Sequence, residues 1–201
     1  MDNLDSHIEI KLGIPEEFRH QAAIICYEGF RSQIEWLVGS QQKSMIKLLA
    51  HSLDSELGLT AQRQGQLVGF VGLQYENRPF FQFERSQCIQ ELGFLRGLLA
   101  FLLFSSATKS LPKEMFIAVL VVDASMRGKG IGTLLMQAVF EIAQQNQIQA
   151  VVLDVIDTNP DARRLYERLG FKPVRTLKYG YLQSLIGSSA NTTMRKDVIS
   201  L

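Results

Sequence analysis

The feature that most constrains this chain is a glycine-rich turn between an apolar run and a helical pattern. Residues 114–122 form a continuous apolar run, which is typical of a central strand covered on both faces. A glycine-rich turn follows at 127–133, and from Ile131 apolar residues recur at helical spacing up to Ala143. Glycines let the main chain approach a ligand closely, and the free N–H groups at a helix start favour an anion. The sequence therefore predicts a phosphate-binding turn, to which Arg127 and Lys129 add positive charge.

Two common phosphate-binding signatures do not match this turn. The nucleotide-binding P-loop needs a lysine directly after its last glycine, but Thr133 follows Gly132. The dinucleotide fingerprint needs its third glycine where Thr133 stands, and it usually opens an N-terminal βαβ unit. We therefore expect neither of these nucleotide-binding folds.

The remaining patterns predict a mixed α/β fold around one central sheet. Further strands are expected at 8–12, 59–63, 67–73, 148–155, 171–177 and 192–198, and further helices at 18–29, 45–53 and 160–169. Asn159 is expected to cap the last of these helices and Gly170 to end it. Gly65 predicts a hairpin turn, and Gly69 and Gly72 indicate bulges.

An apolar segment at 92–107 predicts a buried or interfacial helix. Leucines keep helical spacing along it while phenylalanines make its other sides apolar too, so such a helix needs cover. Arg96 interrupts the segment, which is shorter than the roughly 20 residues that a membrane-spanning helix needs. We expect no membrane span.

Composition and charge exclude several classes of protein. With 201 residues, 46% of them hydrophobic and 20% charged, the chain resembles folded rather than disordered proteins. A net charge of +1 gives no field that favours nucleic acid as a partner. Cys26 and Cys88 lack disulfide or metal-site spacing and the three histidines lie far apart, so we expect packing cysteines and no metal. These cysteines and an acidic N-terminus without a secretory pattern predict a reducing, cytoplasmic location.

Two motifs in a fixed order resemble the GNAT superfamily of N-acetyltransferases. The first is Arg-Gly-x-Gly-Ile-Gly at 127–132, directly downstream of Val121-Val122-Asp123. The second is the run 159–171, which is similar to the family pattern N-x-x-A-x-x-x-Y-x-x-x-G-F. The resemblance covers about 114–171 and implies a GNAT-like central mixed sheet of about six to seven strands flanked by helices. It also implies a single acetyltransferase domain over residues 1–201, with a helical insertion at about 80–112 before the central strand.

The resemblance implies acetyl-CoA as the co-substrate. Backbone groups of Leu120, Val121 and Val122 would pair with the pantetheine arm. Main-chain N–H groups would hold the pyrophosphate, and they belong to Arg127, Gly128, Lys129, Gly130, Ile131, Gly132 and Thr133. Asn159 and Tyr166 would lie near the cofactor arm, although capping a helix explains Asn159 equally well.

The resemblance also implies two catalytic groups. Tyr166 stands where many family members place the acid that protonates the CoA sulfur, and packing in an apolar helix stripe is its alternative role. Glu114 lies thirteen positions before Arg127, like the base carboxylate of histone-type members, with an exposed strand entrance as its alternative role. A water chain is a further candidate base. No nucleophile with an adjacent base is visible, so direct transfer is preferred to an acyl-enzyme.

These observations predict an acetyl-CoA-dependent N-acetyltransferase acting on a primary amine of a small molecule or protein. Seven acidic against three basic residues among the first 36 favour a cationic acceptor. A non-catalytic acyl-CoA-binding sensor with the same motifs is the alternative function. The apolar segment 92–107 leaves three interpretations open, namely extra core, an acceptor wall or a homodimer contact.

Overall fold

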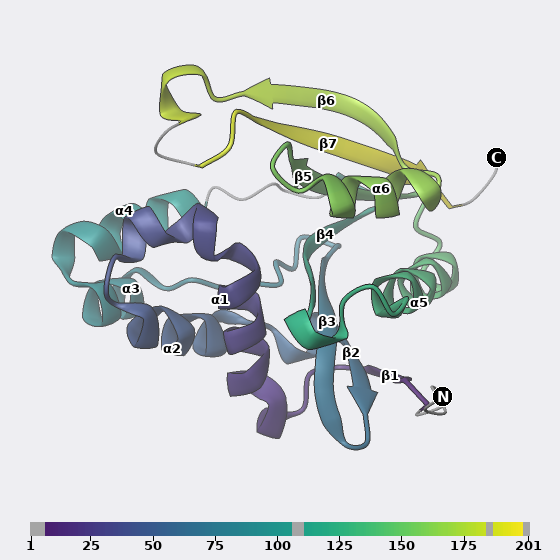
Figure 1. Ribbon diagram of the computed structural model, residues 1–201, viewed down its shortest axis with the longest axis horizontal. Coiled ribbons are helices and arrows are strands. Elements are labelled where there is room, and N and C mark those ends of the chain that lie inside the picture. The colour runs from purple at the N-terminus through teal and green to yellow at the C-terminus, as the bar shows by residue number, and fades with distance from the viewer. Residues whose placement is uncertain (1–6, 106–110, 184–186, 199–201) are drawn as a thin grey trace.

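A seven-stranded sheet with the order β1-β2-β3-β4-β5-β7-β6 forms the centre of the molecule (Figure 1). The computed structural model describes residues 7–105, 111–183 and 187–198. Its strands are β1 (Glu9–Leu12), β2 (Gly58–Arg63), β3 (Gln66–Gln74), β4 (Glu114–Val122), β5 (Ala150–Ile156), β6 (Lys172–Lys178) and β7 (Ala190–Asp197). Neighbouring strands pair antiparallel except β4 and β5, which are parallel. The predicted mixed α/β fold and its strand number are confirmed.

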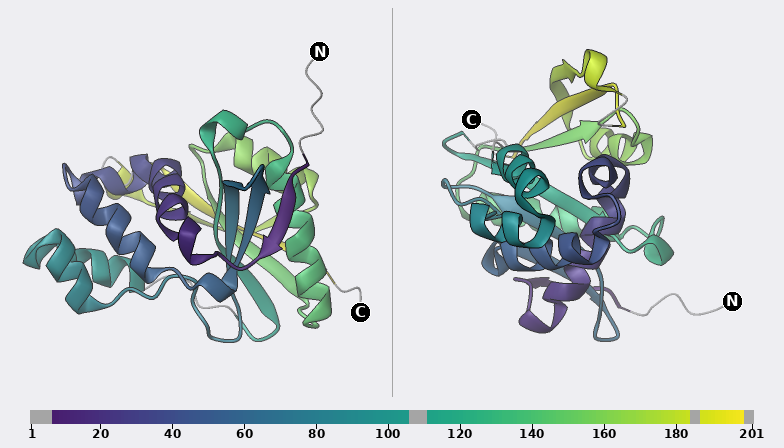
Figure 2. Two further views of the ribbon diagram at one scale, coloured as in Figure 1. Left: turned by 90° about the horizontal axis from the view of Figure 1, so that it is seen from below. Right: turned by 90° about the vertical axis from the view of Figure 1, so that its left-hand side faces the viewer.

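Helices cover both faces of this sheet (Figure 2). One face carries α1 (Glu16–Val38) and α2 (Gln42–Ser52), and beside them α3 (Arg85–Leu92) and α4 (Phe94–Ser105). The other face carries α5 (Ile131–Gln145) and α6 (Pro160–Arg168). The described residues also include three short 3-10 helices, η1 (Ser55–Leu57), η2 (Ala124–Met126) and η3 (Gly180–Leu182). The two sides of the sheet therefore have separate hydrophobic cores.

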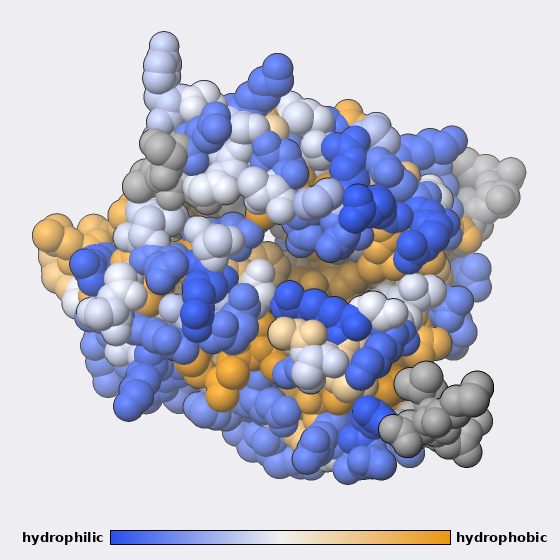
Figure 3. Space-filling model, in the orientation of Figure 1, coloured by the Kyte–Doolittle hydropathy of each residue, from blue (hydrophilic) through white to orange (hydrophobic). Residues whose placement is uncertain are grey.

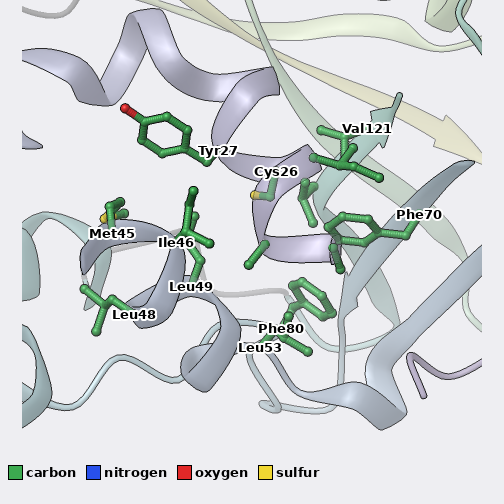
Figure 4. Close-up of a cluster of buried hydrophobic side chains, with 14 of the residues drawn as sticks. Cys26, Tyr27, Met45, Ile46, Leu48, Leu49, Leu53, Phe70, Phe80 and Val121 are labelled. Carbon is green, nitrogen blue, oxygen red and sulfur yellow. The ribbon is translucent and has the colours of Figure 1, made fainter. Parts of the chain in front are cut away.

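The first core joins α1 and α2 to the middle strands (Figure 4). Phe70 of β3 and Val121 of β4 meet Cys26 of α1 in it, and all three are buried. Gly29 lets α1 approach β4, because a Cβ atom there would lie 2.8 Å from a Val121 methyl carbon. Burial raises the pKa of the Cys26 thiol to about 12, so the thiol stays neutral. Cys88 is also buried, which agrees with the predicted packing role of both cysteines.

The β2–β3 hairpin forms where Gly65 predicts it. Gln64 and Gly65 both have positive φ, 51° and 74°, which suits the tight turn between two twisted strands. The β3 pairing shifts register near Gly69 and again beside Gly72, so the predicted bulges are present. Gly72 has a packing reason as well, because the Phe80 ring lies 2.4 Å from where its Cβ atom would be.

The predicted helix at 92–107 is divided at Gly93, whose φ of 80° separates α3 from α4. Gly97 brings α4 very close to α3, since a Cβ atom there would lie 2.3 Å from the Cys88 carbonyl oxygen. The interpretation as extra core is right for Gly97 and Ala100, which are buried, and wrong for the outer side, which is exposed. Residues 106 and 107 of the predicted segment lie outside the described residues. No helix in the described part of the chain is long and apolar enough to cross a bilayer.

Candidate active site

The parallel strands β4 and β5 separate part of the way along their length. They pair only from Glu114 with Ala150 to Ile117 with Leu153, although β4 continues to Val122 and β5 to Ile156. β4 stays paired with β3 up to Val122, so only its β5 side opens. A space-filling view shows a hollow with an apolar floor between α6 and the turn before α5 (Figure 3). An extended molecule can therefore reach the open edge of β4 between the two strands, a region called the fork below.

The backbone of β4 alternates between β3 and the fork. The N–H of Asp123 donates to the carbonyl of Val68, and the Val121 carbonyl points toward Gly69, so both groups face β3. Because peptide groups alternate along a strand, those of Leu120 and Val122 face the fork. The expectation for Val121 is therefore corrected, since its backbone is used by the sheet and its side chain is buried against α1.

The glycine-rich turn at 127–133 follows the open end of β4. Asp123 accepts a hydrogen bond from Ser125 N at 2.9 Å, which starts η2 and ends the strand. The hydroxyl and N–H of Ser125 both lower the pKa of the Asp123 carboxyl. Arg127 Nε donates to the Val122 carbonyl at 3.1 Å, so this side chain holds the turn against the fork.

The main chain of this turn keeps its donors free. Gly128 and Gly130 have φ of 76° and 81°, and nothing lies within 4 Å of a Cβ atom added at either. Beyond the turn, the first N–H that donates to a carbonyl of the protein is that of Leu134, and its acceptor is the Gly130 carbonyl. Among the described residues, no backbone acceptor takes a hydrogen bond from the N–H groups of residues 127–133. Uncapped donors at the start of α5 form an anion-binding arrangement.

Lys129 lies in the turn but is directed toward the protein, with Nζ 3.5 Å from the sulfur of Met126. Gly132 brings α5 against α6, because a Cβ atom there would lie 3.2 Å from a methyl carbon of Leu165. The beginning of α5 and the side of α6 therefore meet beside the fork. This contact places the second motif next to the first.

Tyr166 of α6 lies in the core between α6 and the sheet. Its ring packs on Phe171 with 5.9 Å between ring centroids, and it is buried. Burial raises the pKa of the phenol to about 12, which keeps it protonated and able to donate. No hydrogen bond of the phenol to another described residue is present, so packing and proton donation are both compatible with its position.

Asn159 performs the capping role that the sequence predicts. Its side-chain oxygen accepts a hydrogen bond from Ala162 N at 3.1 Å, and Pro160 follows at the first helical position. The position of Asn159 just beyond β5 also puts it at the open end of the fork. Capping already explains the residue type here.

Glu114 stands at the paired end of β4, away from the open part of the fork. Its carboxylate forms an ion pair with Arg195 of β7, and the Glu114 side chain is 15% exposed. Because Met115 belongs to the core on the α5 side, Glu114 lies on the opposite face, whereas Tyr166 is on the α5 side. The structure therefore does not bring the two candidate catalytic groups together, and Glu114 is not the exposed strand entrance.

Asp154 is a carboxylate at the fork that sequence reasoning missed. It is the first residue of β5 beyond the paired part, and it alternates with Leu153 and Val155, which face α5. It therefore lies on the α1 face, where Thr193 Oγ1 donates to it at 2.6 Å. Its place inside an apolar strand, in Val-Leu-Asp-Val, was the available signal.

A cavity of about 540 Å³ opens where β5 ends, between Asp157 and the connection from β6 to β7. Ser188 Oγ donates to Asp157 at 2.6 Å and both Ser189 N and Ser189 Oγ donate to it, so this carboxylate anchors the wall of the cavity. The Ser188 and Ser189 hydroxyls lower the pKa of Asp157 to about 2. Within the described ranges, no group of three potential metal ligands occurs.

The chain belongs to the acetyltransferase (GNAT) family of enzymes. The family model matches residues 25–171, more than half of the chain, and this span includes the fork, the turn and α6. This match confirms the family that the two motifs indicate.

Curated relatives match shorter stretches. N-alpha-acetyltransferase 30 of Xenopus laevis is 36% identical over 77 residues, which are 38% of this chain and 28% of that protein. The protein of the same name from Dictyostelium discoideum is 32% identical over 87 residues, 43% of this chain and 47% of that protein. N-acetylaspartate synthetase of Xenopus tropicalis is 40% identical over 58 residues, 29% of this chain and 21% of that protein. The matched stretches thus span less than half of each of these relatives.

Solved structures agree over almost the whole chain. An acetyltransferase superimposes with a TM-score of 0.62 and 23% identity, covering 95% of this chain and 100% of the other. Ard1 from Thermoplasma volcanium gives a TM-score of 0.61 and 18% identity, covering 96% and 99%. At these identities the likeness supports the fold alone.

Proposed function

We propose that this protein is an acetyl-CoA-dependent N-acetyltransferase that transfers the acetyl group directly to an amine. The observation that carries the proposal is the open fork followed by a turn whose N–H groups at 127–133 are free. The peptide groups of Leu120 and the N–H of Val122 are available to an extended, amide-containing arm, and the turn is available to a diphosphate. Acetyl-CoA, the substrate of this family, contains both parts and supplies the thioester.

The proposed acceptor is an α-amino group at a peptide N-terminus. An α-amine has a pKa of about 7.7–8.0 against about 10.4 for a lysine side chain, so much more of it is neutral at physiological pH. This matters because both nearby carboxylates already have partners: Glu114 forms an ion pair with Arg195, and Asp154 accepts a hydrogen bond from Thr193. Relatives named N-alpha-acetyltransferase support the same acceptor class. The cavity beside Asp157 gives room for the acceptor at the open end of β5.

Two carboxylates are candidates to take the proton of the amine. Asp154 lies on β5 at the fork itself. Glu114 lies at the start of β4, where β4 and β5 are still paired. Both are on the α1 face, and Tyr166 is on the α5 side, from which its phenol would give a proton to the departing sulfur. In this arrangement the proton donor and the acceptor amine approach from opposite faces of the sheet.

Substituting the two carboxylates separately tests this assignment. If Asp154 is the proton acceptor, Asp154→Asn should lower kcat by about 10²-fold and flatten the rise of kcat with pH. Glu114→Gln should then change kcat only slightly, because the ion pair that it removes stabilises the packing of β7 and does not take part in the reaction. The reverse result would assign the role to Glu114, and little change in either variant would favour a water chain.

The activity itself is tested with acetyl-CoA, a panel of peptides and small amines, and detection of the released thiol. We expect release that depends on a free peptide N-terminus and disappears when the peptide is already acetylated. Thiol release with lysine side chains or small amines alone would overturn the acceptor class. Tight acetyl-CoA binding without release for any amine would instead favour a non-catalytic acyl-CoA sensor.

A further inference from the structure

Two covered amide oxygens have no hydrogen-bond partner among the described residues. They are Oδ1 of Asn191 in β7 and Oε1 of Gln33 in α1. The side-chain nitrogen of neither residue donates a hydrogen bond to another residue that the structure describes, so both amide groups are unused. A covered acceptor without a donor costs free energy, so each of these oxygens needs an explanation.

Asn191 lies on the same face of the sheet as Asp154. In the pairing of β5 with β7, Thr193 is directly opposite Asp154, and Asn191 is two residues before Thr193. Side chains two residues apart on a strand point to the same face, so Asn191 and Asp154 are diagonal neighbours about 7–8 Å apart. Thr193 Oγ1 donates to Asp154 at 2.6 Å and holds the carboxylate there. The unused amide is therefore next to the candidate proton acceptor.

Packing does not explain an asparagine at this position. Asparagine is depleted in strands, and both cross-strand neighbours of Asn191 are apolar. They are Ile156 on β5 and Leu177 on β6. An apolar side chain here would extend the same surface and leave no polar group unused. The residue type therefore indicates a hydrogen bond with a molecule other than the described chain.

Gln33 approaches the same region from α1. It lies one helical turn after Gly29, which packs against Val121 of β4, so Gln33 is on the side of α1 that faces the sheet. The preceding residue, Ser32, contacts the connection from β6 to β7, because a Cβ atom at Gly187 would lie 3.2 Å from the Ser32 carbonyl oxygen. Since β5 lies between β4 and β7 in the sheet, this part of α1 crosses the open end of the fork.

Two acceptor oxygens beside a carboxylate are complementary to a chain of N–H groups. A peptide N-terminus supplies such a chain, because its amine carries N–H groups and the first peptide N–H follows about 3.5 Å further along. With the amine at Asp154, that peptide N–H comes within reach of the short side chain of Asn191. A lysine side chain has methylene groups at this distance, so it would leave the amide oxygen unpaired.

We propose that Asn191 is a specificity-determining residue, whose side-chain oxygen accepts the N–H of the first peptide group of the acceptor. A half turn of the amide, which exchanges its oxygen and its nitrogen, breaks no hydrogen bond to a described residue, so the oxygen can face the acceptor. Gln33 supplies a second acceptor from the opposite wall. The inference rests on the proposed acetyltransferase function, so its test measures peptide binding separately from turnover.

Two acceptors that differ in one group test the hydrogen bond. The first is a short peptide with a free N-terminus, and the second is its ester analogue, in which oxygen replaces the first peptide N–H. The wild type should acetylate the peptide with a kcat/KM at least about tenfold above that for the ester. Asn191→Leu, which has nearly the same size, should lower kcat/KM for the peptide about tenfold and bring the ratio of the two acceptors close to one.

Stability separates this role from a structural one. Because the amide has no partner among the residues described, Asn191→Leu should leave Tm unchanged or raise it, and the Kd for CoA should not change. Gln33→Leu should also keep Tm, and it should weaken peptide binding to the CoA-loaded protein in isothermal titration. The matched control is Thr192→Val on the opposite face of β7, where Thr192 bonds to Thr176 at 3.1 Å. This control should keep the wild-type ratio of peptide to ester.

The outcomes distinguish the inference from the proposed function. If the wild type acetylates the peptide but its ratio of peptide to ester is near one, or if Asn191→Leu keeps the wild-type ratio, the inference is wrong and the acetyltransferase function stands. A lower Tm with an unchanged ratio would give Asn191 a structural role instead. A wild type that neither binds the peptide nor releases thiol with it would overturn the proposed acceptor and the role of Asn191 together.

Discussion

Gly130 gives the sharpest test of the anion-binding turn. The substitution Gly130→Asp places a carboxylate where we propose that a diphosphate binds, and the free protein has nothing within 4 Å of the new Cβ atom. The protein should therefore accept the side chain without a clash. A non-glycine residue at φ 81° should lower the free energy of unfolding by about 1–2 kcal/mol. For a chain of this size, this loss lowers Tm by roughly 2–8 °C.

The effect on cofactor binding should be larger than the effect on folding. Two unit charges 4 Å apart repel by about 1 kcal/mol in water and about 4 kcal/mol at the effective dielectric constant of a protein surface. A carboxylate beside a diphosphate should therefore raise the Kd for CoA at least about tenfold, since tenfold corresponds to about 1.4 kcal/mol. Gly130→Asn has nearly the same shape without the charge, so it should weaken binding less.

Isothermal titration with CoA measures these differences, and Gly65→Asp supplies the matched control. Gly65 also has a positive φ, 74°, and open space around its Cβ position, but it lies in the β2–β3 turn. Gly65→Asp should lower Tm by a similar amount and leave the Kd for CoA unchanged. The reasoning is refuted if Gly130→Asp binds CoA as tightly as Gly65→Asp does.

Three further predictions follow from the site. Tyr166→Phe should lower kcat about 10²-fold or more with little change in the Kd for CoA if the phenol donates the proton, and an unchanged kcat in steady-state assays would leave Tyr166 a packing role. Asn159→Ala should cost about 1 kcal/mol of stability in denaturant unfolding through loss of its bond to Ala162 N, while Asn159→Ser keeps the cap; an equal loss in both would contradict capping. The pKa of Asp157 is lowered from 3.8 to about 2, so its contribution to stability is complete above pH 3.8 and is lost as pH falls toward 2. As pH falls toward 2, the Tm of Asp157→Asn should therefore decrease less than the Tm of the wild type. Equal decreases in Tm would contradict the hydrogen bonds from Ser188 and Ser189.

The elements that the sequence predicted well are those with strong local signals. α5 has an uninterrupted apolar period, α6 has Asn159, Pro160 and Gly170 at its ends, and the hairpin has Gly65. Each of these signals lies within the element it specifies, so no knowledge of the tertiary structure is needed. The free N–H groups of the glycine-rich turn were predictable for the same reason.

Other parts of the site depend on tertiary pairing and could not be read from local pattern. Whether β4 and β5 stay paired is decided by their neighbours in the sheet, so the fork and the position of Asp154 were missed. The partner of Glu114 is 81 residues away on β7, and such a contact has no local signal. The outer side of α4 was expected to be covered because apolar residues usually are, but packing on α3 needs only one side of the helix.

The opening of the fork has a physical cause in β4 and β3. The bulge beside Gly72 gives β4 one extra residue, Ala118, directly after the last residue that pairs with β5. A bulge bends its strand and increases its twist, and here β4 stays with β3 while β5 is held on its other edge by β7 along its whole length. The extra residue of β4 therefore lies where its pairing with β5 ends. Because the Phe80 ring occupies the space beside Gly72, the segment before α3 helps to fix this bulge. The segment that leads into α3 and α4 is therefore structurally linked to the proposed binding site.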